Sequence, residues 1–489
     1  MNKVFNIAIL TFCLITISCE SAKKEHVKIT KQPNILFCIA DDWGWPHAGI
    51  YGDNIVKTPA FDRVAKEGML FENAFISSPS CTPSRSAILT GQHFWRLGKS
   101  ANLWSTLDVN IPVYPLLLKK SGYHTGYYRK AWGPGNLKKG GYINSNPAGT
   151  NYKDGIKAFL EAKPEDAPFC FWLGASDPHR PYKKGIGKAS GMNIEEINVP
   201  RFYPKDTIIQ SDIADYYFEV ERFDNDVNNA IKLLEERGEL ENTIIVITGD
   251  HGMPFPRCKG NLYDWGSRVP LAIRWGSKIT KNRTINDFVS LTDLAPTFLA
   301  AANLDIPKEM TGKSLLPILL SNNEGWVEKQ RKQVVFGRER HTPAQLAPSM
   351  NGYPSRALRT KDYLYIKNIE PDRWPAGVPN GATHPMNNFS DADNGPTKTH
   401  LIKLNNTKES KYYDLSFAKR PADELYDIAK DPYQVNNLAQ NPNYLETVRN
   451  LSKELITILK QNKDPRVMDN GADFDNYPYM SSYNLKTKK

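Results

Sequence analysis

A cysteine close to an arginine is the first feature of this chain that could do chemistry. Cys81 lies in the segment Ser80-Cys81-Thr82-Pro83-Ser84-Arg85, directly before an apolar run. A proline here is typical of a helix start, which would place the cysteine near the helix N-terminus. The helix dipole and the Arg85 guanidinium both favour negative charge there. These residues alone are equally consistent with ordinary structure, because small buried cysteines and prolines at helix starts are common.

Acidic residues follow two apolar runs, 34–40 and 243–247, that have the pattern of strands buried in a parallel sheet. Asp41 and Asp42 come directly after the first run, and Asp250 and His251 follow the second. The carboxyl ends of parallel strands meet at one edge of a sheet, where α/β proteins hold their sites. Adjacent carboxylates repel each other unless a cation lies between them. We therefore expect Asp41, Asp42, Cys81, Asp250 and His251 to form a divalent-cation site, with calcium favoured by the oxygen ligands.

Three basic residues in separate segments complete the candidate site. Lys130 lies in a glycine-rich stretch, His179 follows the apolar run 169–173, and Lys259 lies downstream of His251. Taken singly, Lys130 could be a solvated surface lysine and His179 a turn residue. The position of His179 after a predicted strand favours the site.

Together these segments resemble the type I sulfatases of the alkaline phosphatase superfamily. The residues from Cys81 to Gly91 match Cys-x-Pro-x-Arg followed by Leu-Thr-Gly, the signature in which cysteine is oxidised to formylglycine. Lys130 matches the lysine of the family's Gly-Lys-Trp-His segment, and Trp132 stands where the family has histidine. His179 matches the family's His-x-Pro segment. The phrases around Lys259 are most similar to the heparan N-sulfatase branch, and the resemblance covers about residues 33 to 460.

The resemblance implies a role for each of these residues. Cys81 would become the formylglycine nucleophile through a formylglycine-generating enzyme or an anaerobic maturase, with Arg85 and the cation beside it. Lys130, His179 and Lys259 would bind sulfate, and His179 would act as general acid. With Trp132 in place of histidine the usual base is missing, which leaves either His124 as a candidate or Lys130 together with solvent.

Further basic residues could contact the rest of a substrate. Arg180 follows His179, and Arg338, Arg340 and His341 form a basic cluster in a region that resembles the specificity-bearing part of the heparan N-sulfatase branch. Such a cluster could bind uronate or neighbouring sulfate groups. The alternative is a solvated charged loop.

The length and pattern of the chain predict how these segments are supported. A chain of 489 residues is expected to form two unequal domains. Strands alternate with helices, including predicted helices at 58–68 and 215–237, which indicates an α/β sandwich with a large, mostly parallel sheet. We expect a catalytic domain over 33–373 of the alkaline-phosphatase-like fold. Residues 374–489 would form a linker and a smaller C-terminal α+β subdomain, ending in a helix near 444–461.

The N-terminus predicts export. A lysine followed by a short apolar run has the pattern of a signal peptide over residues 1–19, and Ile17-Ser18-Cys19 resembles a bacterial lipobox. We expect a periplasmic or outer-membrane-associated lipoprotein anchored at Cys19, with simple signal-peptide cleavage as the alternative. The remaining four cysteines lack the spacing of a disulfide scaffold or a structural zinc site.

Composition narrows the range of partners. The 63 Lys and Arg residues against 53 Asp and Glu residues give a formal net charge of +10, which suits anionic substrates. No nucleic-acid-binding motif is present. We therefore expect a sulfatase that acts on a sulfated polysaccharide, such as algal ulvan or a heparan-type glycan, or on its oligosaccharides. The bond that it cleaves would be a sulfate ester or an N-sulfate. The alternatives are a phosphodiester or phosphonate hydrolase of the same superfamily and a catalytically inactive glycan-binding relative.

Overall fold

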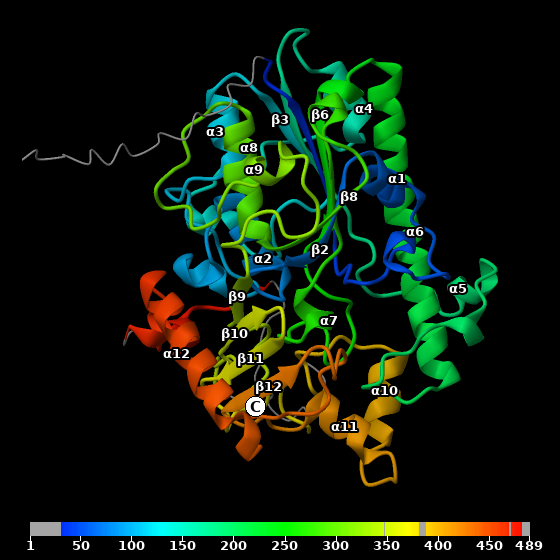
Figure 1. Cartoon of the computed structure of the whole chain (residues 1–489), viewed down its shortest axis with the longest axis vertical. Coiled ribbons are helices and arrows are strands. Elements are labelled where there is room, and N and C mark those ends of the chain that lie inside the picture. Colours follow the sequence, from blue (N-terminus) through cyan, green and yellow to red (C-terminus); the bar gives the residue numbers. More distant parts are fainter. Residues whose placement is uncertain (1–30, 347, 381–387, 469–470, 482–489) are drawn as a thin grey trace, which may run out of the picture.

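The computed structural model has the α/β architecture that the sequence pattern predicts (Figure 1). It describes residues 31–346, 348–380, 388–468 and 471–481. The predicted export signal and Cys19 lie outside the described residues, as does part of the predicted loop at 374–398.

A sheet of eight strands forms the centre of the larger part. Its strand order is β4-β3-β5-β1-β6-β7-β2-β8, and all neighbouring pairs are parallel except those made by β7. The sheet is therefore mostly parallel, as predicted. Its strands are β1 (Asn34–Ala40), β2 (Met69–Phe75), β3 (His124–Tyr128), β4 (Thr150–Asn151), β5 (Phe169–Gly174), β6 (Thr243–Gly249), β7 (Leu271–Arg274) and β8 (Arg283–Ser290).

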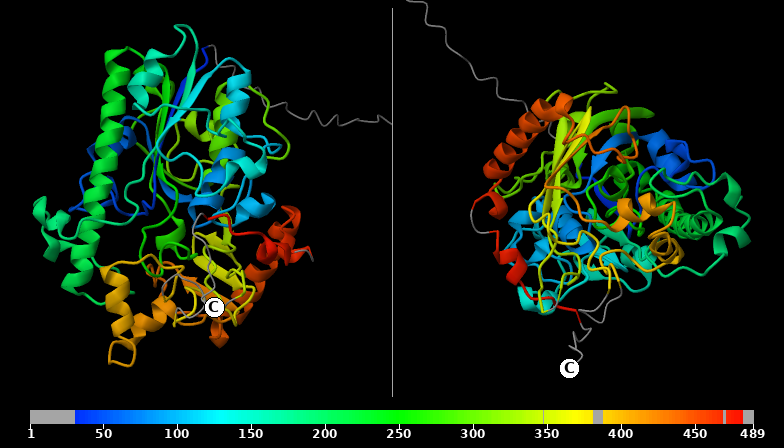
Figure 2. Two further views of the ribbon diagram at one scale, coloured as in Figure 1. Left: turned by 180° about the vertical axis from the view of Figure 1, so that it is seen from behind. Right: turned by 90° about the horizontal axis from the view of Figure 1, so that it is seen from below.

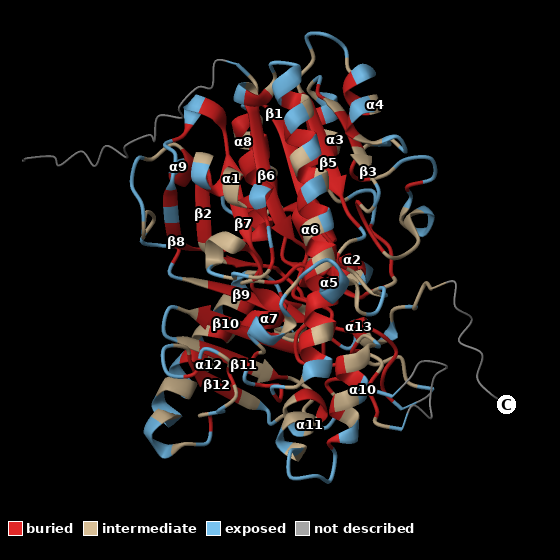
Figure 3. Cartoon of the chain, turned by 90° about the vertical axis from the view of Figure 1, so that its right-hand side faces the viewer, coloured by how far each residue is buried: buried red, intermediate tan, exposed pale blue. Residues whose placement is uncertain are grey.

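Helices cover both faces of this sheet, which is why its central strands are buried throughout (Figures 1 and 3). On β1, Leu36 and Cys38 belong to the apolar cluster that includes α1, α4 and α6, while Ile35 and Phe37 belong to the cluster that includes α2, α3, α8 and α9. These helices are α1 (Pro59–Glu67), α2 (Cys81–Thr90), α3 (Tyr114–Lys120), α4 (Gly155–Glu161), α6 (Thr207–Glu236), α8 (Leu294–Ala301) and α9 (Leu316–Leu319). Helix α6 begins eight residues before the predicted start at 215.

A second, antiparallel sheet lies below the carboxyl ends of the large sheet's strands (Figures 1 and 2). It has the order β12-β11-β10-β9. Helix α12 packs on one face, and the other face contacts Phe75 of β2 and Phe288 of β8. Three of its strands precede residue 374 and one follows it: β9 (Gln333–Arg338), β10 (Ser355–Thr360), β11 (Tyr363–Asn368) and β12 (Asp423–Asp427).

The remaining helices lie around the lower part of the molecule and in its connecting loops. They are α5 (Ile186–Ala189), α7 (Asp264–Ser267), α10 (Pro396–Lys403), α11 (Ser410–Phe417), α12 (Leu445–Gln461) and α13 (Asp473–Asn476). Helix α12 confirms the predicted terminal helix. In the described part of the chain, every helix is too short or too polar to span a bilayer.

A buried ion-pair network joins the C-terminal segment to the small sheet. The Arg356 guanidinium of β10 donates to Asp464 at 2.5 Å and to Glu339 at 2.8 Å, and Arg466 pairs with the other oxygen of Glu339 at 2.7 Å. Arg356, Glu339 and Asp464 are at most 2% exposed. Removing one charge from such a network leaves its partners buried and unpaired.

We therefore expect Arg356→Met to destabilise the protein by about 3–5 kcal/mol, seen as a lower melting temperature. Arg129→Met is the matched control, because Arg129 and Asp226 form an ion pair of 2.6 Å whose side chains are each about one third exposed. That change should cost no more than about 1 kcal/mol. Equal losses for both variants would contradict the structural role of the buried network.

Candidate active site

The predicted site residues lie at the carboxyl edge of the large sheet. Strands β1 and β6 are parallel neighbours with Ala40 opposite Gly249, so the residues that follow them emerge side by side. A Cβ atom on Gly249 would lie 2.0 Å from the carbonyl oxygen of Trp43, so only glycine allows the chain after β1 to pass this closely. The two strand ends thereby bring Asp41, Asp42, Asp250 and His251 together, as the sequence predicts.

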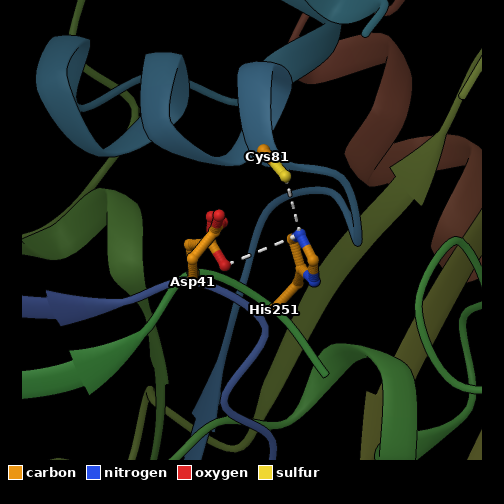
Figure 4. A group of neighbouring side chains, drawn as sticks. Asp41, Cys81 and His251 are labelled. Atoms are coloured by element: carbon orange, nitrogen blue, oxygen red, sulfur yellow. Dashed lines mark hydrogen bonds and ion pairs between the residues drawn. The ribbon is translucent and has the colours of Figure 1, made fainter. Parts of the chain in front are cut away.

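Cys81 is the first residue of α2 and points toward the same strand ends (Figure 4). Its Sγ atom lies 3.3 Å from Nε2 of His251. Both side chains are buried, and burial raises the pKa of the Cys81 thiol. Burial therefore disfavours the nucleophilic thiolate form of an unmodified cysteine at this position.

The donor atoms around Cys81 fit a divalent cation. One ligand atom from each of Asp41, Cys81, Asp250 and His251 lies within 4.8 Å of the others. Within the described part of the chain Asp42 Oδ1 is buried without a hydrogen-bond partner, and it lies 3.2 Å from His251 Nε2. The Nδ1 atom of His251 lies 3.1 Å from the carbonyl oxygen of Gly252, to which it can donate, so the lone pair of Nε2 faces the carboxylates.

Two lysines bring positive charge to the same carboxylates. Lys130 Nζ lies 2.5 Å from Asp41 Oδ2, and Lys259 Nζ lies 2.9 Å from Asp42 Oδ2. Burial opposes ionisation of Asp41, but Lys130 and the neighbouring cations hold the pKa of its carboxyl well below the ordinary value. Burial likewise opposes the charge on Lys130, but Asp41 raises the pKa of this ammonium group. Both lysines are therefore cations beside Cys81.

Arg85 holds the acidic groups in place from within α2. It is completely buried, its Nε donates to Asp250 Oδ2 at 2.7 Å, and its Nη1 donates to the carbonyl oxygen of Lys130 at 2.8 Å. The contact from Arg85 Nη2 to Asp41 Oδ1 is longer, at 3.5 Å. Arg85 therefore joins three of the segments that form the site.

His179 lies on the cavity side of this group, whereas His124 does not. His179 Nε2 is 4.0 Å from Asp42 Oδ2, and its Nδ1 is 2.6 Å from the carbonyl oxygen of Arg180. His124 is the first residue of β3, at the opposite edge of the sheet, where its Nε2 lies 3.0 Å from the Tyr152 hydroxyl. The hypothesis that His124 replaces the missing histidine is therefore wrong, because the strand length separates it from Cys81.

The arginines predicted to bind substrate mostly make structural contacts within the protein. Arg180 borders the cavity, but its guanidinium donates to both oxygens of Asp212 at 2.8 Å and lies between Phe255 and Tyr182. Arg338 is buried and pairs with Asp391 at 2.7 Å. These contacts fix the loops that surround the cavity.

Arg340 and His341 are also buried, so the alternative of a solvated charged loop is wrong. Arg340 is 1% exposed and donates to the carbonyl oxygen of Met350, and neither it nor Arg338 is among the described residues that border the cavity. His341 does border it, 2.8 Å from the Ser80 hydroxyl. Burial lowers the pKa of His341 to about 3, so at neutral pH it offers a polar but uncharged contact.

The site opens into a cavity of about 1030 Å³, which we call the catalytic cavity. Lys130, His179 and Lys259 line it together with Cys81. Its lining also includes residues for which the sequence pattern provides no signal: Trp104, Tyr479 and Asp393. Asp393 Oδ2 lies 3.0 Å from Lys259 Nζ, which lowers the pKa of the Asp393 carboxyl despite its burial. The cavity therefore combines cations near Cys81 with the Asp393 carboxylate beside Lys259 and with aromatic rings.

Trp132 forms part of the cavity wall. Its indole Nε1 donates to the Ser86 hydroxyl at 2.7 Å, and Ser86 in turn bonds Ser100 at 2.6 Å. The only polar atom of this side chain is therefore engaged within the protein, and the ring itself supplies apolar surface to the cavity.

Comparisons with known proteins agree with this geometry. Residues 33–304 match the family model described as Sulfatase, and residues 249–374 match the model N-sulphoglucosamine sulphohydrolase, C-terminal. The chain is 27% identical to an ulvan-active sulfatase of Formosa agariphila over 93% of this chain and 80% of that protein. It is 28% identical to human N-sulphoglucosamine sulphohydrolase, covering 89% and 91% of the two chains.

A solved structure shares the same fold. The protein crystallised in complex with D-glucosamine-2-N,6-O-disulfate superimposes with a TM-score of 0.61 and 22% identity, over 91% of this chain and 99% of that one. The overall fold that positions the catalytic cavity is therefore shared with this solved structure.

Proposed function

The chain belongs to the sulfatase family, and from this premise we propose that it removes sulfate groups from a sulfated polysaccharide or its oligosaccharides in the catalytic cavity. One observation supports this proposal most strongly. Cys81, at the start of α2, lies beside the carboxylates that follow β1 and β6 and beside the ammonium groups of Lys130 and Lys259. Cations around a reactive position match the negative charge that a sulfate group spreads over its three terminal oxygens.

We infer that a maturase enzyme oxidises Cys81 to formylglycine and that the site holds calcium. Asp41, Asp42, Asp250 and His251 would hold the cation, whose positive charge suits sulfate oxygens. The aldehyde of formylglycine at position 81 would add water to form a gem-diol, and one of its hydroxyl oxygens would attack sulfur as the sugar oxygen or nitrogen leaves. Loss of a proton from the second hydroxyl would then expel sulfate and restore the aldehyde. Burial raises the pKa of the Cys81 thiol and disfavours its thiolate, which supports a role for the modified residue as nucleophile.

The other residues bind and orient the reacting group. Lys130 and Lys259 would each place an ammonium group on a sulfate oxygen, and Arg85 would keep Asp250 aligned through its 2.7 Å hydrogen bond. His179, with Nδ1 bonded to the carbonyl oxygen of Arg180, presents Nε2 to the cavity and would deliver a proton from this atom to the departing sugar oxygen or nitrogen.

The relatives suggest two classes of substrate. One relative is named for ulvan, and the other for N-sulphoglucosamine, so algal ulvan and heparan-type glycans are both candidates. We also propose that the protein is exported and anchored at Cys19, where it would meet such polysaccharides outside the cytoplasm.

Measurement of sulfate release from ulvan, heparan sulfate and their oligosaccharides tests the proposed function. We expect release from at least one of these glycans, and a comparison of O-sulfated with N-sulfated oligosaccharides identifies the bond. Hydrolysis of phosphodiesters without sulfate release would favour the phosphodiesterase alternative. Tight glycan binding without any turnover, by protein whose Cys81 has been converted, would favour the glycan-binding alternative.

Trp132 should contribute little to the chemical step, because its N–H is bonded to Ser86. We expect Trp132→Phe to lower the free energy of unfolding by about 1 kcal/mol, the value of one hydrogen bond, and to change kcat by less than about threefold. Lys130→Met should lower kcat by about 100-fold in the same assay. A comparable loss in Trp132→Phe would contradict the assignment of Trp132 to the cavity wall.

A further inference from the structure

A second cavity, of about 690 Å³, lies beside the catalytic cavity. It is formed by the end of α3, strand β3, the short strand β4 and the loop at 135–146. Gly133 and Pro134 border the catalytic cavity, and Gly135 and Asn136 border the second one. The two cavities are therefore separated by a ridge that is only a few residues wide.

Contacts with neighbouring segments hold this ridge in place. Two of its three central residues are glycines, and a Cβ atom on Gly135 would lie 2.4 Å from the carbonyl oxygen of Ser105. The carbonyl oxygen of Pro134 accepts a hydrogen bond of 2.5 Å from Thr82, which neighbours Cys81 in α2. The Trp132 ring also packs against the ridge, because a Cβ atom on Gly135 would lie 2.7 Å from it, so a chain-like ligand that crosses from one cavity to the other would pass this ring.

Basic side chains border the second cavity. Lys119 at the end of α3 and Lys138 are both exposed, and no ion pair of either ammonium group is found among the described residues. No aspartate or glutamate is among the described residues that line it. The cavity therefore has a positive potential that is not neutralised at its own surface.

The rest of the lining suits sugar rings. Asn144 and Asn151 are exposed amides, and the Tyr142 hydroxyl is buried without a hydrogen-bond partner in the described structure. Ile143 is 61% exposed, which is unusual for a large apolar side chain and provides a surface for the apolar face of a ring. Tyr127 adds an aromatic ring, and its hydroxyl accepts from Asn146 at 3.4 Å.

We propose that this second cavity is a binding site for the sulfated polysaccharide chain beyond the residue that is being hydrolysed. Lys119 and Lys138 bind its sulfate or carboxylate groups, the amides bind its hydroxyls, and the ridge at 133–135 lets one chain occupy both cavities. This inference rests on the proposed function, because it describes where the rest of the same polysaccharide substrate binds. It predicts that the second cavity matters for polymers and not for small sulfated substrates.

The test uses the full chain with both lysines reversed in charge, Lys119→Glu with Lys138→Glu. Binding to ulvan and to heparan sulfate is measured by affinity electrophoresis in a Cys81→Ser background, which removes turnover. We expect the dissociation constant for the polymer that the enzyme hydrolyses to rise by about tenfold, and less at high salt. In the active background KM for the polymer should rise, while kcat/KM for a sulfated monosaccharide should stay unchanged.

A matched control is Lys278→Glu with Lys281→Glu, two exposed lysines between β7 and β8 at the opposite edge of the sheet. It carries the same change in net charge and should leave polymer binding unaltered. Unchanged polymer binding by the Lys119/Lys138 variant, or the same loss in the control, overturns the inference. Equal losses on polymer and monosaccharide also overturn it, because they indicate damage to the catalytic cavity. Absence of sulfate release by the wild-type protein is a separate result, which contradicts the proposed function and leaves the binding measurement valid.

Discussion

Replacement of Cys81 with alanine should lower the rate of sulfate release by about 10⁴-fold or more, because it removes the side chain from which the nucleophile is made. Among the four free cysteines of the described structure, Cys81 is the one that lines the catalytic cavity, and its Sγ atom lies 3.3 Å from His251. The measurement is the initial rate of sulfate release from the best substrate of the glycan panel, with the melting temperature recorded for both proteins.

Cys170→Ala is the matched control for this loss. Cys170 is also a buried free cysteine, but it lies in β5, in the apolar cluster packed between the sheet and α2, α3, α8 and α9. We expect it to cost about 1 kcal/mol of stability and to keep nearly full activity in the folded protein. Sulfate release by Cys81→Ala at more than about one hundredth of the wild-type rate would contradict the role of this residue.

Asp42→Asn should remove most of the activity together with the stabilisation by calcium. Asp42 has a positive φ of 76°, a conformation that asparagine tolerates, so the backbone can be kept while one negative charge is lost. Its Oδ1 atom lacks a hydrogen-bond partner in the described structure and faces His251. We expect kcat to fall by about 10²–10³-fold, because one ligand of the cation and a partner of Lys259 are weakened together.

The stabilisation is read from the melting temperature with and without calcium. Saturating calcium at about 100 times its dissociation constant should stabilise the wild-type protein by about 2.7 kcal/mol, and Asp42→Asn should lose most of this effect. Asp393→Asn is the comparison, since Asp393 also contacts Lys259, at 3.0 Å, and has a carboxylate oxygen within 4.8 Å of ligand atoms of Asp42 and His179, but is not one of the residues proposed to hold the cation. It should retain the calcium effect. If Asp42→Asn were stabilised by calcium as strongly as the wild type, Asp42 would not be a ligand.

The core of the site could be anticipated because it depends on regular structure. Apolar runs identify β1 and β6 as buried parallel strands, and parallel strands necessarily end at one edge. The residues directly after them, Asp41 and Asp250, are therefore neighbours whatever the loops do. The start of α2 follows from the same local rules, which places Cys81 at a helix N-terminus.

Residues on irregular segments could not be placed in this way. Asp393 lies in a stretch without periodicity, and its contact with Lys259 depends on the fold of a long loop. Arg180 follows His179 in sequence, which is where a substrate-binding residue is expected. Only the structure shows that its guanidinium is hydrogen-bonded to Asp212 of α6. The wrong prediction for His124 has a related cause. His124 and Lys130 are close in sequence, but strand β3 runs between them and places them at opposite edges of the sheet.

The central claim is that formylglycine made from Cys81 releases sulfate, and peptide mass spectrometry tests it most directly. The peptide containing residue 81 is analysed in preparations made with and without a formylglycine-generating enzyme, and sulfate release is measured on the same preparations. We predict that the fraction of thiol converted to aldehyde varies between preparations and that the rate of sulfate release rises in proportion to it. A rate that is independent of conversion, or sulfate release by protein whose Cys81 is entirely unmodified, would contradict the claim.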